Sequence, residues 1–210
     1  SGLKVSLGAN TLTLSGGGTL GNTTPILLNN ANSKLLLNSI TVGSVSTTAN
    51  NSGVDVNENS TITSLAVGHT TPVSIAAGKT LSGAVTVTAG SIKLGETGTL
   101  GSTVSMSGGK LDADNNLTLS GALTQSGDIE IHVAEDKTLS YSGAAVNLGA
   151  KTLTMSGKGT FSNTNALVLN TTSSKLLLSN TTTVNSVSTS SNSQGVDVNE
   201  SSTITSLAVG

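Results

Sequence analysis

The stretch GVDVNENSTITSLAVG at residues 53–68 returns, with one substitution, as GVDVNESSTITSLAVG at residues 195–210. Val54 corresponds to Val196 in this pair, an offset of 142. Upstream, GANTLTLSG at 8–16 corresponds to GAKTLTMSG at 149–157, an offset of 141, so one residue is inserted between the two blocks. Self-similarity at a long fixed offset is typical of repeat proteins. We therefore predict one continuous segment over residues 1–210, with a first sequence copy at 8–148 and a partial second copy at 149–210.

Apolar and polar residues alternate through most of each copy. The first example is LKVSLGANTLTLSG at 3–16, in which Leu3, Val5 and Leu7 are followed by Leu12 and Leu14. Such alternation, interrupted by Gly and Asn, is typical of half-buried β-strands. The 25 glycines and the abundant β-branched residues argue against helices. The sequence thus predicts an all-β protein.

A shorter period of roughly 20 residues, within the range typical of solenoid repeats, lies inside the long one. It is carried by apolar residues next to Thr or Ser, namely Leu20, Ile40, Ile62, Leu81, Leu100, Leu119, Leu139 and Phe161. Coils of this length cannot bury their apolar face alone, whereas stacked coils share one inner column. We therefore predict a parallel β-solenoid with coils of about 20 residues and seven coils per 142-residue repeat. At about 4.8 Å per coil, the repeat would span roughly 34 Å and the whole chain roughly 50 Å.

The expected inner column is aliphatic and narrow. Its predicted members in consecutive coils are Val85, Val87, Ile92, Leu94, Val104, Met106, Leu111, Leu117 and Leu119. Aromatic residues make up only 1% of the chain, so a large globular core is not expected. Thr, Ser, Asn and Lys are expected on the outer surface.

The charge pattern limits the partners that the chain could bind. Charged residues are 10% of the sequence, and the formal net charge is −2. We find no basic patch for nucleic acid and no apolar run long enough to cross a membrane, so neither partner is expected for this segment. Cysteine is absent, which leaves no disulfide or thiol chemistry.

The search for reactive or metal-binding groups predicts no catalytic, cofactor-binding or metal site. Residues 112–116, DADNN, resemble the opening of a calcium loop but lack its later Gly and Glu, so we interpret them as a solvated turn. Asn57 and Glu58 are expected in another turn. His132 follows Glu130 in an alternating segment and should face solvent with it, and His69 has no partner at metal-ligand spacing.

Two kinds of surface could nevertheless make contacts. The runs at 26–28 and 35–37, and the copy of the second run at 176–178, place at least one Leu outward, so Leu27, Leu36 and Leu177 are candidate lateral contacts. The alternative is an ordinary exposed leucine. Strand edges at the two ends make Leu3, Val5, Leu207 and Val209 candidates for end contacts.

The TLTLSGGGTL block at 11–20 and its copy TLTMSGKGTF at 152–161, with the Gly-, Ser- and Asn-rich coils, resemble bacterial or archaeal tandem-repeat surface proteins. These include autotransporter passengers and filamentous-haemagglutinin-like adhesin stalks. The resemblance implies a secreted structural segment of a cell-surface fibre that continues or associates with copies of itself. One alternative is a lateral binding module for glycans, ice or sister fibres. A further alternative, a polysaccharide-processing β-helix, lacks the expected clustered carboxylates and aromatic platforms.

Overall fold

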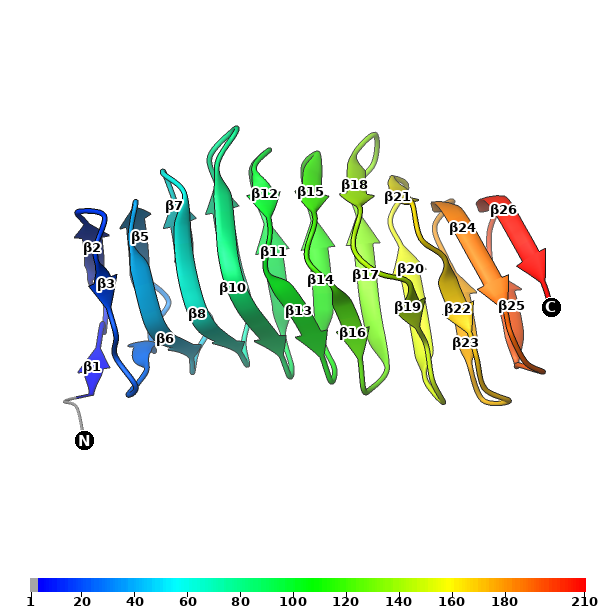
Figure 1. Cartoon of the computed structure of the whole chain (residues 1–210), viewed down its shortest axis with the longest axis horizontal. Helices are drawn as coiled ribbons and strands as arrows, with labels where there is room; N and C mark the ends of the chain where they lie inside the picture. The colour runs from blue at the N-terminus through cyan, green and yellow to red at the C-terminus, as the bar shows by residue number, and fades with distance from the viewer. Residues whose placement is uncertain (1–3) are drawn as a thin grey trace.

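The computed structural model describes residues 4–210, which form a parallel β-solenoid without any helix. The predicted fold class is therefore confirmed. The coils follow one another along the long axis, and two parallel sheets face each other across the interior (Figure 1). No helix in the described part of the chain is long and apolar enough to span a membrane.

Sheet B, as we name the ten-stranded sheet, is built from one strand per coil. Its order follows the chain, so each strand pairs in parallel with the corresponding strand of the next coil. The repeat-equivalent strands β2 and β20 lie in this sheet. Its strands are β2 (Thr11–Ser15), β5 (Lys34–Asn38), β7 (Gly53–Val56), β9 (Thr71–Ile75), β11 (Ser91–Leu94), β14 (Lys110–Ala113), β17 (Ile129–Val133), β20 (Thr152–Ser156), β23 (Lys175–Leu178) and β25 (Gly195–Val198).

Sheet A has sixteen strands because several coils contribute two short strands in place of one long one. The long strands are β6 (Thr41–Thr47), β8 (Ser60–Val67), β10 (Thr80–Val87), β24 (Thr183–Thr189) and β26 (Thr203–Val209). The short strands are β1 (Val5–Ser6), β3 (Thr19–Leu20), β4 (Ile26–Leu28), β12 (Thr99–Leu100), β13 (Thr103–Met106), β15 (Leu117–Leu119), β16 (Leu123–Gln125), β18 (Thr138–Tyr141), β19 (Val146–Asn147), β21 (Thr160–Asn163) and β22 (Leu167–Leu169).

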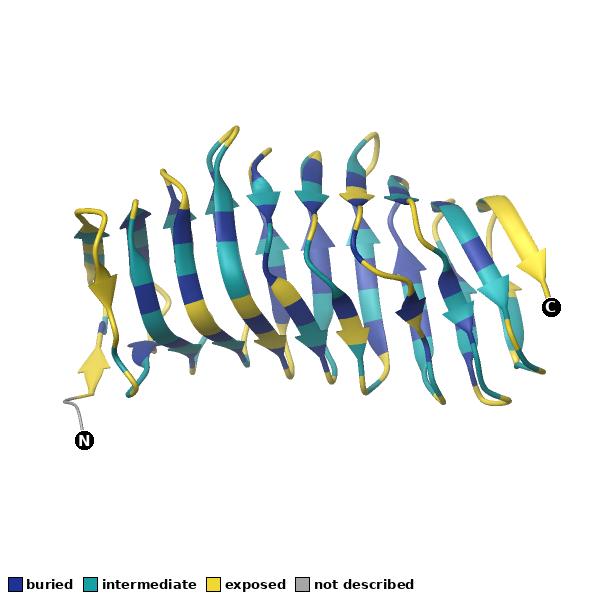
Figure 2. Cartoon of the chain, viewed as in Figure 1, coloured by how far each residue is buried: buried dark blue, intermediate teal, exposed yellow. Residues whose placement is uncertain are grey.

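The interior is a hydrophobic column that is aliphatic, as expected, except for the buried rings of Tyr141 and Phe161. All nine residues predicted for it between Val85 and Leu119 are at most 3% exposed. Val85 is paired with Val104 and Ile92 with Leu111, so like side chains stack from coil to coil. Figure 2 shows this burial alternating along the central strands, with the exposed residues concentrated on the strands at the two ends.

The residues that mark the 20-residue period are not ladder partners at four of its seven steps. Leu20 and Ile62 are both paired with Val42 and not with Ile40, because Ile40 lies just before β6. Leu81 is paired with Ser60, because the register shifts at a bulge between Gly83 and Val85. Leu119 is paired with Tyr141 and not with Leu139. The coils differ in length where sheet A bulges or breaks, and a spacing read from the sequence does not show on which side of a break the extra residues lie.

Asparagine side chains replace the backbone pairing lost at two breaks in sheet A. Asn22, between β3 and β4, donates to the carbonyls of Thr24 and Ser44 and accepts from the Gly43 N–H. Asn163, its equivalent in the second sequence copy, donates to the carbonyls of Asn165 and Ser186 and accepts from two backbone N–H groups. Since buried backbone groups must be paired, these side chains allow the chain to bend without losing hydrogen bonds.

Candidate functional site

The two outer faces of the solenoid differ in charge. The sixteen described strands of sheet A contain no Asp, Glu, Lys or His. The ten strands of sheet B contain nine such residues: Lys34, Asp55, Lys93, Lys110, Asp112, Glu130, His132, Lys175 and Asp197. One face therefore offers only neutral hydrogen-bonding groups, and the other offers ion pairs.

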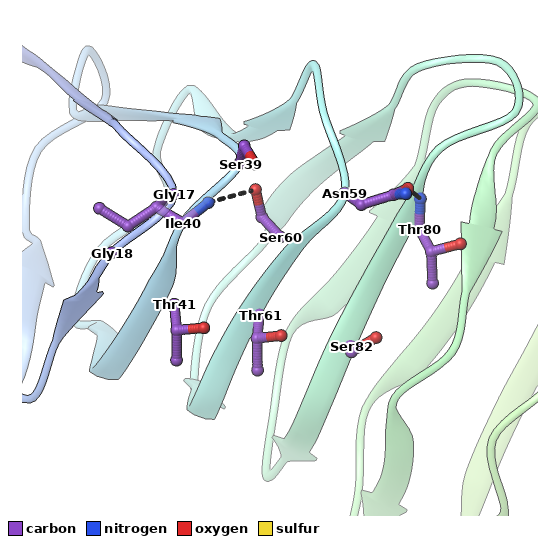
Figure 3. Close-up of a pocket in the computed structure, with 10 residues that line it drawn as sticks. All are labelled: Gly17, Gly18, Ser39, Ile40, Thr41, Asn59, Ser60, Thr61, Thr80 and Ser82. Atoms are coloured by element: carbon purple, nitrogen blue, oxygen red, sulfur yellow. Dashed lines mark hydrogen bonds between the residues drawn. The ribbon is translucent and has the colours of Figure 1, made fainter.

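The neutral face of sheet A is lined by rows of hydroxyl side chains. Thr41, Thr61 and Ser82 are opposite one another on β6, β8 and β10. They border a shallow hollow of about 350 Å³, and Figure 3 shows them in a row across neighbouring strands. The turns close one side of this hollow, where Ser60 Oγ accepts from Ile40 N and Asn59 Oδ1 accepts from Thr80 N at 2.9 Å.

Two further hollows lie over the same sheet. One of about 360 Å³ is bordered by Thr118 and Ser140, and one of about 250 Å³ by Thr86, Ser105 and Thr124. Hydroxyl groups both donate and accept hydrogen bonds, so these surfaces suit an uncharged, hydroxyl-rich ligand or a second neutral face.

Neither aromatic ring is available on this surface as a stacking platform. Tyr141 and Phe161 are at most 1% exposed, and their rings stack with centroids 5.8 Å apart. The Tyr141 hydroxyl donates to the Ala144 carbonyl at 2.6 Å and accepts from Leu123 N at 3.1 Å. Burial raises the pKa of this hydroxyl above its ordinary value, partly offset by the Leu123 N–H.

The charged face of sheet B carries a cluster that the sequence interpretation missed. Asp112 lies within β14 and is 5% exposed, so its assignment to a solvated turn is wrong. Its carboxylate oxygens are 3.8 Å from Lys93 Nζ, 3.6 Å from Lys110 Nζ and 3.9 Å from His132 Nε2. The missed signal was the coil spacing, because Lys110 and Asp112 lie one coil before Glu130 and His132, to which they are paired.

His132 faces outward beside Glu130, as predicted, because β17 alternates buried and half-buried residues. Its Nδ1 is 3.0 Å from Ser156 Oγ, and that hydroxyl also contacts Glu130 Oε1. The Ser, His and Asp combination resembles a nucleophilic triad in composition only. The Ser156 hydroxyl is buried and its proton points to Glu130, so its oxygen is not presented to a substrate.

Among residues 4–210, no group of three or more His, Cys, Asp or Glu side chains is arranged to hold a metal ion. His69 is exposed in the connection between β8 and β9, on a different coil from His132. Asn57 and Glu58 form the predicted turn after β7, and Glu58 pairs with Lys79 at 2.6 Å. Asp55 pairs instead with Lys34, also at 2.6 Å, so the two carboxylates do not form one site.

The candidate contact residues differ in how much surface they offer. Leu27 lies outside the core cluster but is only 9% exposed, whereas Leu36 and Leu177 are half-buried on the outer face of sheet B. At the ends, Val5 is 45%, Leu207 is 52% and Val209 is 79% exposed. Leu3 lies outside the described residues.

Comparison with known proteins gave no match: no family model fits the chain, and no curated protein or solved structure is significantly similar to it. The likeness to autotransporter passengers and adhesin stalks thus remains one of composition and coil period.

Proposed function

We propose that this chain is a structural segment of an elongated extracellular fibre or adhesin stalk on a cell surface. The observation that carries the proposal is the continuous hydrophobic column shared by the coils, with near-identical residues 53–68 and 195–210 occupying equivalent strands. Such an array gains length by adding coils, since each coil needs only its neighbours. In this proposal the chain catalyses no reaction, binds no cofactor or nucleic acid, and does not insert into a membrane.

The repeat provides a direct test of the spacer role. Because Gly210 is equivalent to Gly68, a second copy of residues 69–210 can follow Gly210 in frame. We expect this extended chain to lengthen by roughly 34 Å at unchanged cross-section, from about 4.8 Å per coil. Small-angle X-ray scattering measures both dimensions. A chain that grows in width, or collapses into a compact particle, would contradict the spacer role.

A second candidate function is lateral binding through the neutral face of sheet A. It is favoured by the lack of charged residues in the described strands of that sheet and by the hollows along it. The proposed partner is a neutral polysaccharide, and fibre–fibre contact is the competing outcome. Co-sedimentation with insoluble uncharged polysaccharides should be lost in T61K on sheet A and kept in S74K on sheet B. Sedimentation of the protein alone would indicate self-association, and equal binding by both variants would exclude this face.

A further inference from the structure

Three neighbouring strands of sheet B bring one imidazole, one hydroxyl and two carboxylates into contact. Asp112 lies on β14, Glu130 and His132 on β17, and Ser156 on β20. The contacts run from Asp112 Oδ1 to His132 Nε2 at 3.9 Å, from His132 Nδ1 to Ser156 Oγ at 3.0 Å, and from Ser156 Oγ to Glu130 Oε1. The network is separate from the neutral face to which the lateral-binding role was assigned.

The hydroxyl fixes where the proton of the imidazole lies. Ser156 has a single hydroxyl proton, and an ionised carboxylate can only accept. Glu130 Oε1 accepts the hydrogen bond from Ser156 Oγ and also lies 3.7 Å from Lys110 Nζ. Ser156 must therefore donate to Glu130 and accept from His132, so Nδ1 carries a proton.

With the proton on Nδ1, the other ring nitrogen of His132 and the facing oxygen of Asp112 are both hydrogen-bond acceptors. A neutral His132 with its proton on Nδ1 presents a lone pair at Nε2. The facing atom, Asp112 Oδ1, is buried and has no hydrogen-bond partner. Two acceptors then face each other across 3.9 Å, and the Asp112 side chain is only 8% exposed, so the arrangement is unfavourable.

We propose that His132 and Asp112 form a proton-binding site that closes this network across sheet B. With a proton on Nε2, His132 can close the 3.9 Å gap to Asp112 Oδ1 and donate to it while Nδ1 donates to Ser156, and each buried polar atom of the network then has a partner. The other charged groups facing the site are Lys93 from β11 and Lys110 from β14, which contact Asp112 Oδ2 and leave Oδ1 to the imidazolium. The coils around 110–156 are therefore tightest when His132 is protonated, and they loosen as it loses its proton.

The tautomer of neutral His132 is the first test. The chain has only two histidines, so ring nitrogen–proton NMR spectra of the whole protein, assigned with H69Q, separate them. Above about pH 8, where imidazoles are ordinarily neutral, we expect the proton of His132 on Nδ1. In E130Q the introduced amide can donate to Ser156, which frees the hydroxyl to donate to Nδ1. The His132 proton should then move to Nε2. A wild-type His132 protonated on Nε2, unchanged in E130Q, would overturn the proposal.

The linkage to stability is the second test. Between about pH 5.5 and 8, carboxylates and lysines ordinarily keep their charges, so an imidazole dominates the change. Because the proton completes the folded network, we expect the melting temperature to fall by roughly 2–4 °C across this range. The fall should vanish in H132Q and shrink in D112N, whose amide can donate to Nε2, while H69Q keeps it. An equal fall in wild type and H132Q would overturn the proposal.

Discussion

Residues 53–68 and 195–210 share all but one residue, yet they lie in different environments. Leu65 and Val67 are at most 1% exposed, whereas their equivalents Leu207 and Val209 are 52% and 79% exposed. In the first copy β9 and β10 cover β7 and β8, pairing Leu65 with Val85 and Val67 with Val87. In the described structure no strand lies beyond β25 and β26. The same sequence is thus core or surface according to whether a coil follows it, and burial here comes from the neighbouring coil.

The largest expected difference is between two equivalent leucines. Leu65→Ala should lower the free energy of unfolding by about 2–5 kcal/mol, because it leaves a cavity between coils. Leu207→Ala should lower it by about 0.5 kcal/mol, as for a surface position. Chemical denaturation of both variants measures the difference. Similar losses would mean that each coil is stabilised from within.

A pair of glycines separates the effect of stacking from that of backbone conformation. Gly53 and Gly195 have φ values of 93° and 87°, but a Cβ on Gly53 would lie 2.1 Å from the Pro72 carbonyl oxygen, whereas Gly195 has open space. Gly195→Ala should cost only the left-handed strain of about 1–2 kcal/mol. Gly53→Ala should cost about 1–3 kcal/mol more, from overpacking against the next coil. Equal losses in thermal unfolding would show that the coils can separate freely at this position.

The asparagines at the breaks in sheet A are expected to show a smaller contrast. Asn163 is 3% exposed and Asn22 is half-buried. Asn163→Ala leaves two backbone donors and two acceptors unpaired, so we expect a loss of about 2–3 kcal/mol. For Asn22→Ala, where water can reach the freed groups, we expect about 1 kcal/mol. Urea titration compares the variants, and the reverse order would argue against the bracing role of these side chains.

The smallest contrast is between two equivalent ion pairs. Lys34–Asp55 and Lys175–Asp197 both have a separation of 2.6 Å, but the Asp55 side chain is 25% and the Asp197 side chain 48% exposed. Double-mutant cycles to Ala should give at most about 1 kcal/mol for either pair, with the inner one larger and less sensitive to salt. A larger coupling free energy for Lys175–Asp197 than for Lys34–Asp55 would show that burial does not determine the strength of these ion pairs.

Much of the fold could be predicted because the sequence carries both the apolar–polar alternation of strands and a recurrence of about 20 residues inside the 142-residue repeat. Alternation identified strands, and the shorter of the two recurrences identified coils, so the inner residues from Val85 to Leu119 were assigned correctly. The ladder partners were less predictable, since the Gly83 bulge and the breaks bridged by Asn22 and Asn163 change coil lengths locally.

The charged cluster was harder to find because it depends on the register between coils, which local changes in coil length determine. The outward direction of His132 follows from alternation on its own strand, but its contact with Asp112 depends on the register between coils. Asp112 is followed by Ala, Asp and two Asn, a composition typical of a turn. The turn begins only after Ala113, so local composition concealed a buried carboxylate.

The most direct test of the central claim is hydrogen exchange at residues 53–68 and 195–210 in the same molecule. If neighbouring coils supply the burial, the second segment should exchange far faster than the first in the 210-residue chain. It should become equally protected once residues 69–210 are added after Gly210, because a coil then covers it. Equal protection of the two segments before the extension, or no gain after it, would contradict the account.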